Sequence, residues 1–205
     1  MPRAAGQIDR GKNEAILDAA SEVIFERGLS APLGEIARRA GVSKQTIYNH
    51  YGSKAELVRA LVERRRQSVT APLDLPEAEA HPQAALAAYA RALLETATVD
   101  RGVALLRLLI QSAPHSPELS RTVFGRGARG TRVQLTAFIE REVSAGRLAA
   151  PDPSEAADFF AGMVVSHHQL QGLLGLPPEL TPARIERIAE EAARRFLRAY
   201  ATERP

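Results

Sequence analysis

The chain has 205 residues, of which 45% are hydrophobic, and a formal net charge of +3. This length corresponds to one large domain or two small ones. The absence of cysteine excludes disulfides, thiolate catalysis and metal sites with cysteine ligands. The first twenty residues lack the apolar core of a secretory signal, and the uncharged segment 159–178 contains two histidines and two prolines. We therefore expect an intracellular, cytoplasmic protein that does not enter a membrane.

Apolar residues recur every three or four positions along most of the chain, and no convincing strand pattern is present. The N-terminal helices that this spacing predicts end near Gly28, at Gly41 and near Asn49, and a fourth begins at Lys54. Ser43 is suited to cap the third helix. Ser53 and Glu56 have the spacing of a capping box at the start of the fourth.

The remainder of the chain follows a proline-rich connection over residues 70–82. Apolar spacing predicts helices over Pro82–Thr96 and Arg101–Ser112. Three later helices are expected to begin where a proline follows a residue that can cap a helix, at Pro117, Pro153 and Pro182. We therefore predict an all-α protein with eight or nine helices.

The segment 33–48 has the spacing of a helix-turn-helix. Two crossing helices need a small residue at their contact, which Ala37 supplies, and Gly41 can adopt the left-handed conformation of the turn. Val42 and Ile47 would fill the groove beneath the second helix of this motif. Its exposed face would present side chains that can bond phosphates or base edges: Ser43, Lys44, Gln45, Thr46, Tyr48 and Asn49. An ordinary helical hairpin with a polar outer face is the alternative.

Basic residues gather around this motif. Residues 1–66 hold 12 basic and 8 acidic side chains, whereas residues 67–205 hold 15 and 16. Between Ile36 and Ala55 there is no acid but there are four cations, Arg38, Arg39, Lys44 and Lys54. Such a segment suits a polyanion such as DNA, although a solvated helix face can have the same composition.

The run 41–57 (GVSKQTIYNHYGSKAEL) resembles the DNA-binding signature of TetR-family transcriptional regulators, and the likeness extends over about residues 12–60. More loosely, residues 108–174 look like the C-terminal domain of the AefR/AcrR-like branch. The resemblance implies an N-terminal three-helix helix-turn-helix DNA-binding domain over residues 1–55. A C-terminal helical ligand-binding and dimerisation domain would follow over residues 56–205.

What the resemblance implies in function is a repressor that binds a palindromic operator in double-stranded DNA as a homodimer. The residues expected to contact DNA are Ser43, Lys44, Gln45, Thr46, Tyr48, Asn49, His50 and Lys54. Gln45 is the best candidate for direct readout, because its amide can bond N6 and N7 of adenine together. Lys54 would bind phosphate at a helix N-terminus. The chain departs from the family at residues 32–34 (Pro-Leu-Gly), where Thr or Ser and often a basic residue contact phosphate, so this contact is weakened, with Ser30 as an alternative contact or cap.

A small apolar or amphipathic effector is expected to release the operator. The side chains that could line or orient its pocket are Gln111, His115, Phe124, Phe159, Phe160, Met163 and His167, although the aromatic ones are also typical core residues. The segment 159–174 is uncharged, which favours a dimer interface built with the last two long helices, or alternatively burial within one subunit.

Two other classes of function are the alternatives to this one. The C-terminal bundle could serve dimerisation or protein docking alone, without an effector. An enzyme is not expected, because the chain lacks a nucleophile elbow, a phosphate-binding glycine loop and a His-Glu-x-x-His pair. No cofactor or metal is expected either, since the adjacent His167 and His168 point about 100° apart on a helix and cannot chelate one ion.

Overall fold

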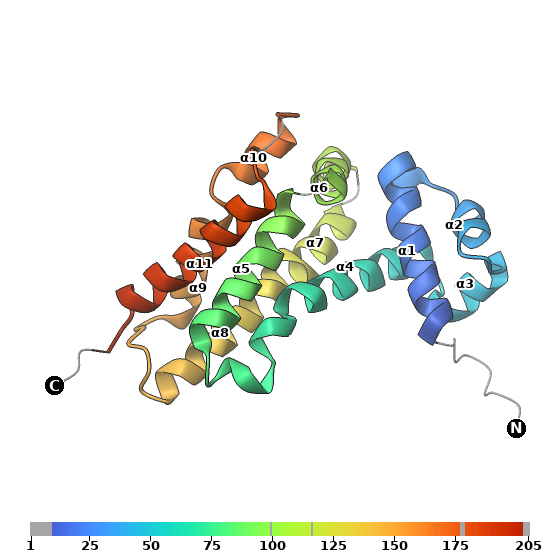
Figure 1. The fold of residues 1–205 in the computed structure, drawn as a ribbon. Coiled ribbons are helices and arrows are strands. Elements are labelled where there is room, and N and C mark those ends of the chain that lie inside the picture. Colours follow the sequence, from blue (N-terminus) through green and yellow to red (C-terminus); the bar gives the residue numbers. More distant parts are fainter. Residues whose placement is uncertain (1–9, 99, 116, 177–178, 203–205) are drawn as a thin grey trace, which may run out of the picture. The chain divides into compact units, whose positions relative to one another are not determined.

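The computed structural model describes residues 10–98, 100–115, 117–176 and 179–202. In these ranges the chain forms eleven α-helices, three 3₁₀ turns and an isolated β-bridge, so the predicted all-α class is confirmed. The helices divide into two compact units (Figure 1). Of the described residues, those up to Arg64 and those within 104–123 form the head unit, and those within 65–103 and from Phe124 onward form the body unit.

The head unit is built on α1 (Arg10–Arg27), α2 (Leu33–Arg39), α3 (Lys44–Tyr51) and the first part of α4 (Lys54–Thr70). The 3₁₀ turn η1 (Gly28–Ser30) joins α1 to α2. Residues from all four helices form one apolar core, with Ile16, Val23, Ile36, Ile47 and Leu57 fully buried. Leu105 of α6 (Asp100–Ser112) and Val123 of α7 (Pro117–Arg126) pack against the same core.

The turns of the head unit follow the local sequence closely. Ser43 Oγ accepts a hydrogen bond from the Thr46 amide at 3.0 Å, so the predicted cap of α3 is confirmed. Gly41 has φ +65°, which is the predicted left-handed conformation. Ser53 caps α4 through the Glu56 amide at 3.2 Å, but the Glu56 carboxylate pairs with Arg59, so the second half of the expected capping box is replaced by an ion pair.

Inside the head unit, η1 and α6 come into close contact at Gly28. Its φ is +72°, and a Cβ added there would lie 3.1 Å from a methyl carbon of Leu108. Glycine is required on both grounds, because a side chain would strain the backbone and displace its neighbour. Residues far along the chain therefore help to shape the connection between α1 and α2.

The body unit is a layered bundle of α5 (Pro82–Thr98), α8 (Ala128–Ser144), α9 (Pro153–Val165), α10 (His168–Leu173) and α11 (Pro182–Ala199). The turns η2 (Ala71–Leu73) and η3 (Pro76–Ala78) occupy the predicted connection before α5. Figure 1 shows α5 beside α11, and α9 contacts α5, α8 and α11. At its centre Phe160 lies between Tyr89 and Phe196, with ring centroids 6.2 and 5.1 Å away.

Capping residues start the body helices where the sequence predicts. The Asp152 carboxylate accepts from the amides of Ser154 and Glu155 at 2.9 and 3.0 Å, and Pro153 begins α9. Thr181 caps α11 through the Arg184 amide at 3.2 Å. The expected cap of α7 at residue 116 lies outside the described residues.

The eight or nine helices expected from the sequence are fewer than the eleven in the described ranges. A helix break at Gly127, where ψ is −97°, separates α7 from α8. Ser166, with φ 46°, ends α9 and lets the short α10 begin two residues later. No helix in the described part of the chain is long and apolar enough to cross a membrane.

Candidate DNA-binding site

One side of α3 packs into the head unit and the other is polar and open. Ile47 is fully buried and Val42 partly buried, as predicted for the residues beneath this helix. Thr46 is half-buried, and the remaining polar residues predicted on α3 and its cap are exposed: Ser43, Lys44, Gln45, Tyr48, Asn49 and His50. The helix therefore presents a continuous surface of hydrogen-bonding groups.

Hydrogen bonds along α3 order this surface before any ligand arrives. Gln45 Nε2 donates to Asn49 Oδ1 at 2.7 Å, one helical turn away. This bond uses one amide N–H of Gln45 and leaves the other N–H and Oε1, which are the donor and acceptor that adenine N7 and N6 require. The Lys44 ammonium lies 5.6 Å from the centre of the Tyr48 ring, within the range of a cation–π contact.

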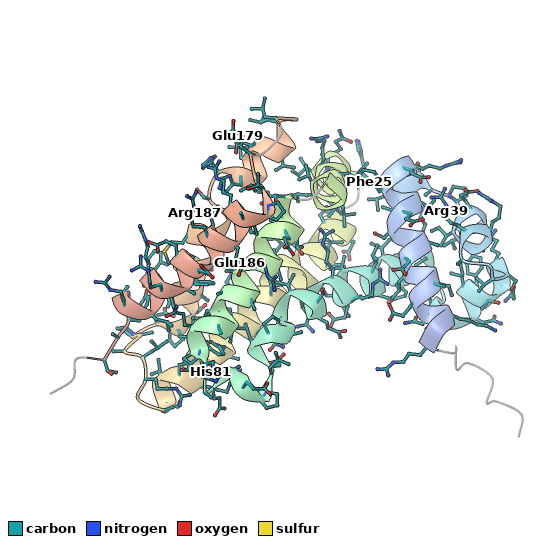
Figure 2. The ribbon with its side chains drawn as sticks, in the orientation of Figure 1. Phe25, Arg39, His81, Glu179, Glu186 and Arg187 are labelled. Atoms are coloured by element: carbon teal, nitrogen blue, oxygen red, sulfur yellow. The ribbon has the colours of Figure 1, made fainter. Side chains whose placement is uncertain are left out.

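The two arginines of α2 are engaged by acidic residues. Arg39 donates to both carboxylate oxygens of Glu26 in α1, at 2.6 and 2.8 Å, and Figure 2 shows it between the two helices. Arg38 donates to Glu35 at 2.6 Å. These hydrogen bonds lower the pKa of both Glu26 and Glu35. In the fold, acidic side chains therefore neutralise part of the positive charge of residues 36–55. One is Glu35, which directly precedes this segment, and the other is Glu26 of α1.

Lys54, expected on phosphate, has protein partners. Its ammonium donates to the main-chain carbonyl oxygens of Leu29 and Ala31, in and just after η1. Burial lowers the pKa of Lys54. The partly buried Tyr51 donates from its hydroxyl to Asn13 Oδ1 at 2.5 Å, so it ties α3 to α1. Sequence reasoning missed both contacts, because the partners lie 23 to 38 residues away.

The start of α2 has the weak cap that its sequence implies. Pro32 occupies the N-cap position and supplies no side-chain hydrogen bond. Ser30 Oγ donates to the Arg27 carbonyl oxygen at 3.2 Å, so it closes the end of α1 instead of capping α2. Any phosphate contact at this end of α2 would have to use main-chain amides.

The residues expected around an effector occupy different environments. Gln111 and His115 are exposed at the end of α6 and beyond it, in the head unit. In the body unit Phe124, Phe159 and Met163 are 59%, 56% and 42% exposed, whereas Phe160 is a core ring. The exposed His167 makes a hydrogen bond with Ser166 Oγ at 3.2 Å. The set of residues expected to bind an effector therefore stays a prediction.

A groove of about 970 Å³ does lie in the body unit, between α5 and α11. Alanines of α5 and charged residues of α11 line most of it, and none of the residues predicted for an effector is among them. Figure 2 shows Glu186 and Arg187 on α11 and His81 just before α5, all three of which contribute to the wall of the groove.

A short α2, a glycine turn and a polar α3 on a shared apolar core define a helix-turn-helix DNA-binding protein. The pattern of the bacterial regulatory proteins of the tetR family matches residues 16–61, and that of the C-terminal domain of AefR-like transcriptional repressors matches residues 84–202. The chain belongs to the TetR family of transcriptional regulators, and its C-terminal domain is of the AefR-like type.

Solved structures of similar proteins cover nearly the whole chain. A TetR transcriptional regulator from Agrobacterium tumefaciens has a TM-score of 0.75 and 27% identity, with 96% of this chain and 97% of that chain covered. The flavonoid-responsive regulator FrrA has a TM-score of 0.68 and 32% identity, over 94% of this chain and 98% of that chain.

Similarity to the first curated relatives covers only part of each chain. The transcriptional activator FasR of Mycolicibacterium smegmatis is 52% identical over 50 residues, which are 24% of this chain and 23% of FasR. The chain matches 23 to 34% of the length of the first curated relatives.

Proposed function

We propose that the protein is a transcriptional repressor that binds a palindromic operator as a homodimer in the cytoplasm and is released by a small apolar or amphipathic effector. The observation that carries the DNA-binding part is the exposed polar face of α3, with its Gln45–Asn49 hydrogen bond, above a buried Ile47. In this proposal residues 1–55 bind DNA and residues 56–205 provide the dimer and effector functions. No role as an enzyme is assigned, and the relatives it resembles are regulators.

The residues that we assign to DNA are polar side chains on α3 and at its ends. Lys44, Gln45 and Thr46 would reach base edges and nearby phosphates, and Tyr48 and His50 the backbone. Ser43 and Asn49 support this surface by their bonds to Thr46 and Gln45. Gln45 carries the sequence preference, because a bidentate contact to adenine discriminates against other bases.

Selection of bound duplexes from a random library, at one stated salt concentration, tests the function. We expect an inverted repeat from the wild-type protein. For Gln45→Ala we expect a loss of roughly 1–3 kcal/mol on that repeat, with relaxed preference at one position of each half-site.

The matched control is Lys44→Ala, which removes a charge. We expect it to weaken binding to the selected and random duplexes more evenly than Gln45→Ala does. Equal losses on both kinds of duplex for Gln45→Ala would remove its readout role. If the wild-type protein binds DNA in a salt-sensitive manner but enriches no repeat, the assignment as a repressor fails. The protein is then an architectural DNA-binding protein.

An exposed apolar surface in the body unit supports the homodimer. Phe159 and Met163 lie one turn apart on α9, and Val133 of α8 is 58% exposed. The neighbouring Arg132 and Asp158 form an ion pair, so these parts of α8 and α9 lie at the same level. A patch of this kind on a regulator is typical of an interface between subunits. The outward face of α11 is rich in charged side chains. We therefore assign the interface to α8 and α9, whereas the sequence led us to expect the last two long helices.

The effector proposal draws on the AefR-like domain and on one relative. FrrA is named as flavonoid-responsive, and a flavonoid is a planar, amphipathic molecule of the class expected from the sequence. A panel of flavonoids, with benzoate as a small aromatic control, is therefore the first set of probes.

Thermal unfolding with these probes distinguishes the effector proposal from a regulator without an effector. A binder at 100 times its dissociation constant is expected to stabilise the protein by about 2.7 kcal/mol, or roughly 5–11 °C in Tm. The same compound should weaken binding to the selected repeat. A compound that stabilises the protein without changing its DNA affinity would favour a body unit that serves dimerisation or docking alone.

A further inference from the structure

Two main-chain carbonyl groups converge on one ammonium group in the head unit. The carbonyl oxygens of Leu29 and Ala31 belong to the connection between α1 and α2, and both accept hydrogen bonds from Lys54 Nζ, at the first residue of α4. Ala31 is 1% exposed, and its main-chain N–H donates a hydrogen bond to the Gly28 carbonyl oxygen at 3.1 Å, which closes the turn. A single side chain thus joins segments that are 23 and 25 residues apart.

The position of Lys54 is otherwise unfavourable for a cation. The N-terminus of a helix carries a partial positive charge, which disfavours an ammonium in the first turn. Partial burial adds to this cost and lowers the pKa of Lys54. The two carbonyl oxygens offset both effects, because each accepts a hydrogen bond from the charged group. With two of its three N–H groups so used, Lys54 has at most one left for any phosphate.

We propose that Lys54 is a positioning residue, which fastens the α1–α2 connection to α4 and so sets the placement of α2 and α3 for DNA binding. The proposal rests on the proposed function for its effect on DNA, but the tether itself belongs to the free protein. It differs from the expectation that Lys54 binds phosphate, which would have the side chain act on DNA directly.

Two readouts separate a tether from a phosphate-binding side chain. Removal of one phosphate interaction reduces the slope of log affinity against log salt by about 0.9, and by about 1.8 when both subunits of a dimer are changed. Removal of a tether leaves that slope unchanged but lets the α1–α2 connection open more often, which hydrogen exchange at the Ala31 amide reports in the absence of DNA. The variants are Lys54→Met, which keeps the apolar stem, and Lys44→Met as a matched control on the exposed face of α3.

For Lys54→Met we expect about 10-fold faster exchange at Ala31, weaker binding to the selected repeat, and a salt slope within about 0.5 of the wild type. For Lys44→Met we expect unchanged exchange and a slope lower by about 1.8. A slope lower by about 1.8 for Lys54→Met overturns the proposal, and so does unchanged exchange at Ala31.

A second variant covers the case in which Lys54→Met does not fold. Lys54→Gln keeps an uncharged NH2 group near the carbonyl groups, and we expect intermediate exchange at Ala31 with the wild-type salt slope. Wild-type-like exchange together with a lower slope would again overturn the tether. If the wild-type protein selects no repeat, the proposed function fails, whereas exchange at Ala31 in the free variants still decides whether Lys54 holds the connection.

Discussion

Raising the salt concentration from 50 to 200 mM is expected to weaken binding to the selected repeat by about 10³-fold, through a slope near −5.4 for about six phosphates per dimer. A dimer that contacts six to ten phosphates would lose about 10³ to 10⁵. The ion pairs of Arg38 and Arg39 and the carbonyl partners of Lys54 place this protein at the lower end. Fluorescence anisotropy of a labelled duplex over a salt series measures the slope.

Random duplex is the control for this experiment. Its binding is expected to be weaker than that of the selected repeat but to depend on salt with a similar slope, because phosphate contacts supply most of non-specific binding. A slope near −9 on the selected repeat would contradict the neutralised α2, since it requires about ten phosphate contacts. In that case Arg38 and Arg39 exchange their acidic partners for DNA on binding.

Truncation of the buried ring in Phe160→Ala is expected to lower the free energy of unfolding by about 3–5 kcal/mol. Phe160 is fully buried between Tyr89 and Phe196, so its removal leaves a cavity at the meeting point of α5, α9 and α11. For a chain of this length the loss corresponds to roughly 6–20 °C in Tm. Denaturant unfolding followed by circular dichroism gives the free energy directly.

The adjacent ring provides a matched control in Phe159→Ala. Phe159 points about 100° away from Phe160 around α9 and is 56% exposed, so its truncation leaves no cavity. In dilute protein below the dimer dissociation constant we expect a change within about 0.5 kcal/mol. At micromolar concentration sedimentation should show a larger monomer fraction than for the wild type. A loss in the dilute monomer as large as that of Phe160→Ala would reverse the assignment of the two faces.

Local rules were sufficient for most of the secondary structure. Caps such as Ser43 and Asp152 act within three residues of their partners, so their spacing in the sequence already specifies the hydrogen bonds. The break at Gly127 and the φ of 46° at Ser166 were harder, because no single side-chain pattern distinguishes a kinked helix from two helices. The helix count was low for this reason, while the all-α class was not affected.

The electrostatics of the site depend on contacts that local spacing does not contain. Arg39 meets Glu26 thirteen residues earlier, and Lys54 meets carbonyl groups that have no residue-type signature at all. The hydrogen-bonding face of α3 could be predicted, because the helical period alone separates Ile47 from Gln45. The net charge around that face could not be predicted, because it depends on how α1, α2 and α4 pack.

The packing of α4, α6 and α7 against the head has a practical consequence for protein production. A fragment cut at residue 55 would lack Leu57, Val58 and Leu61, which are all buried in the core of the head unit. Extension to residue 64 would restore these side chains but still uncover the sites of Leu105 and Val123. An excised DNA-binding fragment is therefore expected to aggregate and to be poorly soluble unless those apolar positions on its surface are redesigned.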